Sequence, residues 1–273
     1  MIRSLDDIRG YTIFASDGEI GHVDDFYFDD ATWTVRYLVV DTGPWILGRK
    51  VLISPQALGK PDWVGRVLPV ELTKEQVKNS PEIDLDKPVS RQKQEVLNRY
   101  YNWNFDWLST QTPTAYGGAA AVPPGPISGA GAPIKPPAPA AEAPGQRGTP
   151  TQETTVEAED AIANSHLRSL DEVIDYDIQA LDGEIGHVED LLVEDDSWVI
   201  RYLMINTRDW LPGRDVIISP AWIDDISWAS ASVIVDLSRE EIQESPEFDQ
   251  DKTLDRQYET RLHEHYNRPY YWE

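Results

Sequence analysis

The chain has 273 residues, a formal net charge of −24 and no cysteine. The lack of cysteine excludes disulfides, thiolate nucleophiles and thiolate metal sites. No apolar run approaches the ~20 residues of a membrane span, and residues 1–7 lack the pattern of a signal peptide, so we expect a cytoplasmic protein without a membrane span.

The acidic charge lies mainly in the second half of the chain. Residues 1–108 carry 13 basic and 17 acidic side chains, whereas residues 166–273 carry 9 basic and 26 acidic side chains. Such a surface repels phosphate backbones and anionic lipids. We therefore expect no nucleic-acid partner, above all for the second half.

The chain contains an internal repeat of two copies. Residues 17–23, Asp-Gly-Glu-Ile-Gly-His-Val, recur unchanged as residues 182–188. The offset of 165 residues holds without a gap from Arg3/Arg168 to Trp107/Trp272. An internal repeat of this length indicates that each copy is one structural unit with its own core.

The repeat predicts three parts. Residues 1–108 and residues 166–273 are two domains, each with a full set of strands, and we expect each to fold alone. Residues 109–165 are rich in proline, alanine and glycine and poor in bulky apolar side chains. Such a segment cannot bury enough surface to offset its ordering entropy, so it is predicted to be a flexible linker.

The first predicted strand contains Tyr11, Ile13 and Ala15. These residues are identical in the second repeat, whereas the residues between them differ. A period of two with one conserved face is typical of a strand with one buried side.

A hairpin is predicted to follow, with glycines as its structural turn residues. Asp17-Gly18 indicates a two-residue primed turn, because glycine accepts the positive φ that this turn requires. Gly21 then predicts a bulge or a close backbone approach inside the next strand. The equivalent glycines of the second repeat are Gly183 and Gly186.

Four further strands are predicted in the first repeat and, at the same offset, in the second. The central one is predicted to be covered on both faces, with Trp33, Val35, Tyr37 and Val39 sharing one face. Pro69 indicates an edge position for the last strand, since proline lacks a backbone donor. The predicted ranges are 20–28, 33–41, 51–53 and 67–72.

Two short helices are predicted after the strands of each repeat. Thr73 with Gln76, and Ser238 with Glu241, have the spacing of a capping box. The second helices are predicted over residues 90–101 and 255–266, and aromatic residues that follow them are expected to dock each helix on its barrel. The fold class is therefore mainly β with α extensions, as two small SH3-like barrels in tandem.

The order of these motifs resembles the PRC-barrel family. The residues that carry the resemblance are a Leu-Asp start, Asp-Gly-x-Ile-Gly-x-Val, a Val-x-Tyr-Leu-Val strand and Gly-Arg-x-Val-x-Ile-Ser-Pro. They lie within residues 4–73 and 169–238. The family includes the soluble domain of the photosynthetic reaction centre H subunit, the C-terminal domain of the ribosome maturation factor RimM and stand-alone bacterial proteins. The resemblance implies the barrel but no chemistry, because members share no reaction.

The loop before the fourth strand holds the candidate interaction residues. Trp45 and Arg49 recur as Trp210 and Arg214, and tryptophan and arginine are favoured anchors of interfaces. The alternative is that Arg49 and Arg214 pair locally with carboxylates while the tryptophan packs in the core.

Histidines and carboxylates are predicted to be structural. His22 and His187 are expected on a strand surface. His263 and His265 stand two residues apart, which does not place two ligands on one face of a helix. The acidic clusters at residues 24–25, 29–30 and 194–196 are expected to be solvated. We therefore predict no catalytic residue, no metal site and no cofactor.

The function predicted from these patterns is that of a non-enzymatic interaction or scaffold protein. Two alternatives remain: an auxiliary subunit or assembly factor of an electron-transfer or ribosomal complex, and an enzyme with a site between the repeats. A cleft lined by matched polar residues favours the enzyme, whereas a dry apolar contact favours the scaffold. We also expect the two repeats to pair within one chain, or between chains as a homodimer.

Overall fold

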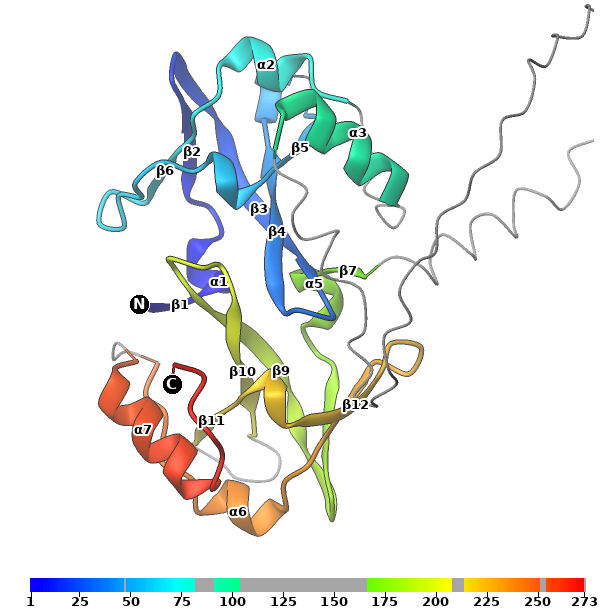
Figure 1. Ribbon diagram of the computed structural model, residues 1–273, viewed down its shortest axis with the longest axis vertical. Coiled ribbons are helices and arrows are strands. Elements are labelled where there is room, and N and C mark those ends of the chain that lie inside the picture. Colours follow the sequence, from blue (N-terminus) through cyan, green and yellow to red (C-terminus); the bar gives the residue numbers. More distant parts are fainter. Residues whose placement is uncertain (47, 82–90, 104–165, 208–213, 251–253, 273) are drawn as a thin grey trace, which may run out of the picture. The chain divides into compact units, whose positions relative to one another are not determined.

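The computed structural model describes residues 1–46, 48–81, 91–103, 166–207, 214–250 and 254–272 (Figure 1). It is mainly β, with two sheets and a few short helices. Both repeats belong to one compact unit. The predicted linker, and the aromatic residues Phe105 and Trp107, lie outside the described residues. In the part that is described, no helix is long and apolar enough to cross a membrane.

The first sheet has the order β5-β4-β3-β2-β6, and β7 pairs with β3 from outside this path. All neighbours are antiparallel except β2 and β6, which are parallel. Its own strands are β2 (Thr12–Ala15), β3 (Gly18–Asp29), β4 (Thr34–Asp41), β5 (Lys50–Ile53) and β6 (Val67–Pro69). The two end strands of this order, β5 and β6, are not hydrogen-bonded to each other among the described residues. The strands of the predicted barrel therefore form an open sheet there.

The second sheet repeats this plan and adds one strand. Its order is β11-β10-β9-β8-β13-β12, and β1 pairs with β9 from outside the path. The strands are β8 (Asp177–Ala180), β9 (Gly183–Glu194), β10 (Ile200–Asn206), β11 (Asp215–Ile218), β12 (Ile223–Ser227) and β13 (Ser232–Val235). β6 ends its strand order, as Pro69 predicted for the first repeat, whereas β13 pairs with β12 in the second repeat.

The first strand of each repeat lies in the sheet of the other repeat. β1 (Ile2–Ser4) pairs antiparallel with β9, and β7 (Leu167–Ser169) pairs antiparallel with β3. Each exchanged strand leads into a one-turn helix, α1 (Leu5–Ile8) or α5 (Leu170–Val173), whose apolar side chains are buried. The expectation that each repeat completes its own sheet is therefore wrong.

The hairpin between β2 and β3 differs from the predicted primed turn. Ala15 pairs with Gly18, so Ser16 and Asp17 are the turn residues and Gly18 begins the strand. Gly18 has a φ of 137°, and Gly183 has a φ of 148°. Neither Ser16 nor Asp17 has positive φ, whereas a type I′ turn requires it at both central positions. Gly18 therefore has the positive φ predicted for it, but it follows the two turn residues and is not one of them.

The central strand is covered on both sides, as predicted, but its faces are divided differently. Tyr37 and Val39 pack in a small cluster with Leu97, whereas Val35 packs in the main core. The register shifts between Tyr27 and Phe28. This bulge moves Val35 to the opposite face from Tyr37, since one extra residue reverses the alternation.

The helices confirm the predicted caps. Both capping boxes are present, at Thr73 with Gln76 and at Ser238 with Glu241. The short helices are α2 (Lys74–Lys78) and α6 (Arg239–Gln243), and the longer ones are α3 (Arg91–Tyr101) and α7 (Arg256–His265). Trp103 lies 6.4 Å from Tyr37 of β4, measured between ring centroids, which docks the end of α3 on the sheet as expected.

One continuous apolar core contains residues from both repeats. Phe26 of β3 lies 6.4 Å from Trp198, measured between ring centroids. The backbone strengthens this contact, because Val35 donates to the carbonyl of Trp198 at 2.8 Å and Ile200 donates to that of Trp33 at 2.7 Å. An apolar contact between the repeats, which favours the scaffold over the enzyme, is thus present among the described residues.

A glycine substitution tests the close backbone approach in β3. A Cβ on Gly21 would lie 2.0 Å from the carbonyl oxygen of Asp41. We expect Gly21→Ala to lower the free energy of unfolding by about 1–3 kcal/mol, because the strands must separate. Gly59→Ala is the control, since its Cβ meets only an ordinary contact at 3.5 Å. Equal denaturation midpoints for the two variants would contradict the close approach.

Candidate functional site

Two buried carboxylates join the repeats. Asp25 on β3 accepts the backbone N–H of Asp171 at 3.3 Å, and Asp190 on β9 accepts the backbone N–H of Asp6 at 3.1 Å. Each carboxylate therefore caps the one-turn helix of the other repeat. The contact of residues 2–9 with the second repeat, and of residues 167–174 with the first, is called the seam below.

The two carboxylates have different further partners. Asp190 accepts the Ser4 hydroxyl and the N–H of Leu191, whereas Asp25 accepts from Nη2 of Arg9 at 3.2 Å. Asp190 is 2% exposed and Asp25 is 7% exposed. Burial raises the pKa of each carboxyl to about 6, because desolvation of the charged form outweighs these hydrogen bonds.

A second pair of carboxylates holds the exchanged strands. Arg168 donates from Nε to Asp30 at 3.1 Å, and Arg3 donates from Nε to Asp195 at 2.8 Å. Each guanidinium also lies over a tryptophan of its own repeat: Arg3 over Trp63 at 3.8 Å and Arg168 over the equivalent ring at 4.2 Å. Each arginine thus links an aromatic side chain of one repeat to a carboxylate of the other.

The prediction that the acidic clusters are solvated is wrong for several members. Asp25 is buried at the seam. Asp29 is 2% exposed, and it accepts the N–H and the hydroxyl of Thr32 at 2.8 and 2.9 Å. A buried carboxylate is tolerated only with such donors. Asp24 behaves as predicted, as a partly exposed partner of Lys50 at 2.7 Å.

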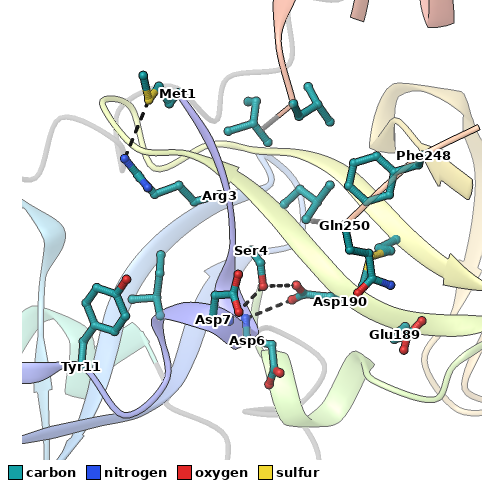
Figure 2. Close-up of a pocket in the computed structure, with 15 residues that line it drawn as sticks. Met1, Arg3, Ser4, Asp6, Asp7, Tyr11, Glu189, Asp190, Phe248 and Gln250 are labelled. Atoms are coloured by element: carbon teal, nitrogen blue, oxygen red, sulfur yellow. Dashed lines mark hydrogen bonds between the residues drawn. The ribbon is translucent and has the colours of Figure 1, made fainter. Parts of the chain in front are cut away.

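A cavity of about 470 Å³ opens beside Asp190 (Figure 2). Residues of β1, α1 and β9 line it, together with the segment before α7. Four carboxylates line the cavity, those of Asp6, Asp7, Glu189 and Asp190. The apolar part of its wall includes Ile2, Ile8, Leu192, Met204, Phe248 and Leu254. Pockets of this size and mixed polarity are typical of small-molecule sites.

The arginines predicted as interaction residues are engaged within their own repeats. Arg49 donates to the carbonyl oxygens of Lys78 at 3.3 Å and of Pro81 at 3.0 Å. Arg214 donates to the carbonyls of Gln243 and Ser245. These carbonyls lie at the ends of α2 and α6, where cations are favoured. The geometry agrees with the alternative of local pairing, although the partners are carbonyls rather than carboxylates.

Of the two predicted tryptophans, the structure describes the one in the first repeat. Trp45 is partly buried against the main core, and Nζ of Lys74 lies 4.6 Å from its ring centroid. Trp210 lies outside the described residues. Among the described residues, Trp45, Arg49 and Arg214 therefore do not form a common exposed surface.

The glycines and strand histidines lie near the hairpins and away from the cavity. Gly186 approaches the carbonyl of Asn206 as Gly21 approaches that of Asp41. His22 lies 3.8 Å from Glu19, and His187 lies 4.0 Å from Asp175, both at exposed or half-buried positions. In the part of the chain described here, no three acidic or histidine side chains are grouped to hold a metal ion.

A buried polar cluster under α7 was not predicted. The hydroxyl of Tyr202 donates to Glu259 at 3.1 Å and lies 3.1 Å from Nε2 of His263. Tyr271 also donates to Glu259, at 2.6 Å. Burial lowers the pKa of His263. The signal was present in the repeat, since the cluster replaces Gln94 and Asn98 of the first repeat at helical spacing.

Comparison with known proteins identifies the first repeat. Residues 2–77 match the family model described as the PRC-barrel domain. The chain therefore carries a PRC-barrel domain, as the sequence motifs indicated. The second repeat lies outside the matched residues, although it has the same motif and strand plan. A search of curated proteins found no match.

The buried carboxylates make a prediction about pH. Ionisation of Asp190 is less favourable in the folded protein than in the unfolded chain, because burial raises the pKa of this carboxyl to about 6. The stability that the protonated carboxyl contributes is therefore present below about pH 4 and is lost as the pH rises through 6. Asp190→Asn keeps acceptors for the helix N–H and can donate to Ser4. We expect this variant to be more stable than the wild type at pH 7.5 by on the order of 2 kcal/mol, and equally stable at pH 4.

Asp25→Asn is the matched comparison for this measurement. It loses the ion pair with Arg9, so its gain at pH 7.5 should be smaller. Urea unfolding between pH 4 and pH 7.5 gives both curves. A pH dependence of Asp190→Asn as steep as that of the wild type would show that this carboxylate does not titrate differently on folding.

Proposed function

We propose that the chain is a non-enzymatic interaction or scaffold protein. The observation that carries this proposal is the PRC-barrel match over residues 2–77, since this domain is a protein-interaction module. The architecture supports it, because the exchanged strands and the shared core join two such units into one body. Two modules joined in this way can present two surfaces on one chain.

Exposed apolar side chains supply a candidate contact surface. Phe14 on β2 is 45% exposed and pairs in register with Pro69 of β6. In the second repeat, Leu181 is 66% exposed after β8, and Ile234 of β13 is 36% exposed. Large apolar side chains on strands of both repeats are costly to leave in water and are typical of protein contacts.

Capture of binding partners tests the proposal. The full chain is immobilised and exposed to an extract of the cells that encode it. We expect a retained protein whose amount falls severalfold with the double variant Phe14→Ser and Ile234→Ser. Val64→Ser is the control, because Val64 is 97% exposed in the turn before β6 and lies on none of these strands. Retention of no protein, or equal loss with the control, would contradict the scaffold function.

The exchanged strands make a separate prediction about the two halves. Residues 1–108 and 166–273, expressed apart, each lose the strand that the other half supplies, and Asp25 and Asp190 lose their N–H partners. A buried carboxylate without donors is unfavourable. We expect each half to melt at lower temperature alone, and a 1:1 complex with a higher melting temperature to form on mixing.

Sedimentation velocity and circular dichroism provide the measurement. The first half can also exchange strands with itself, because the repeats are equivalent, so a homodimer of residues 1–108 agrees with the structure. Self-association of the second half should be weaker, since it carries 26 acidic against 9 basic side chains. Two monomeric halves whose melting is unchanged on mixing would overturn the exchange.

A further inference from the structure

Glu189 and Asp190 have no ion pair among the described residues, whereas their counterparts in the first repeat are paired with cations. In the first repeat, Asp24 pairs with Lys50 at 2.7 Å, and Asp25 pairs with Arg9 at 3.2 Å. At the offset of 165 residues, the two acids are kept as Glu189 and Asp190. The two cations are not kept: Lys50 is replaced by Asp215 and Arg9 by Ile174.

The environment of Glu189 shows the consequence. Its Oε2 atom is buried and has no hydrogen-bond partner among the described residues. Asp215, in place of a lysine, accepts from Nε2 of Gln250 at 3.0 Å, and Gln250 lines the cavity. A buried carboxylate oxygen without a donor is unfavourable. The second repeat thus preserves the anions and removes the groups that neutralise them.

The basic side chains near the cavity are engaged elsewhere. Arg3 lines it, but its guanidinium lies over Trp63 and pairs with Asp195 at 2.8 Å. Arg9 reaches Asp6 only at 3.9 Å and is shared with Asp25 and Asp171. Neither arginine has an ion pair with Glu189 or Asp190 among the described residues.

We propose that this cavity is a binding site for an organic cation, an ammonium group carried on a compact apolar body. The ammonium would take the place that Lys50 and Arg9 occupy in the first repeat, beside Glu189 and Asp190. The apolar body would contact Ile8, Leu192, Met204 and Phe248, which line the same cavity. A volume of about 470 Å³ accommodates a small ligand of this kind.

Titration calorimetry on the full chain tests the site, with 2-phenylethylammonium chloride as the probe. We expect saturable 1:1 binding, and no saturation with 2-phenylethanol, which has the same apolar body without the charge. Glu189→Gln should weaken binding about tenfold or more, since a hydrogen bond to a charged group is lost. Asp24→Asn is the matched control at the equivalent position and should leave the affinity unchanged.

A second variant restores the cation of the first repeat. Asp215→Lys is expected to abolish binding of the probe, because the new ammonium competes for Glu189. Equal affinity in the wild type, Glu189→Gln and Asp215→Lys would overturn the proposal, and so would the same affinity for the alcohol. Lys252, which lies outside the described residues, provides the last arm. If the probe bound the Lys252→Ala variant but not the wild type, the proposal would also be overturned. The ammonium of Lys252 would then occupy the site in place of a separate ligand.

Discussion

The backbone N–H groups at the start of α1 and α5 are the constraint on which the seam depends. A one-turn helix leaves its first N–H groups without internal partners, and burial at an interface removes water as an alternative. Asp190 and Asp25 supply acceptors, each from the other repeat. Loss of the carboxylate would leave a buried N–H donor unpaired, and loss of the helix would leave a buried carboxylate unpaired. Each repeat therefore stabilises the other.

The exchange of β1 and β7 extends this dependence from two hydrogen bonds to the whole core. Once each first strand lies against β9 or β3, the apolar side chains of the following helix are carried into the other repeat. Leu5 and Leu170 are fully buried there. The arrangement is that of an isologous dimer joined into one chain, in which equal surfaces meet twice.

Equivalent positions have diverged where the shared backbone permits it. Lys50 and Asp215 stand at the same point of the two sheets with opposite charge, and Gln94 is replaced by the buried Glu259 under α7. The proposed cation site uses this difference, and its wall includes Ser4 of one repeat and Met204 of the other. A ligand held there would contact both repeats and so stabilise their association, since any ligand of the folded state does so.

Local patterns in the sequence determined the repeat, most strands, both capping boxes and the PRC-barrel resemblance, because each depends on residues close together in the chain. Tertiary structure alone decided the partners of β1 and β7, since a three-residue strand has no periodicity and pairs with residues more than 130 positions away. It also decided the burial of Asp25 and Asp190, the carbonyls bound by Arg49, and the face of Val35. From sequence alone a carboxylate is expected to be solvated, because the N–H donors that permit its burial come from distant parts of the chain. A bulge reverses the two faces of a strand, and the composition of the strand does not indicate where a bulge lies.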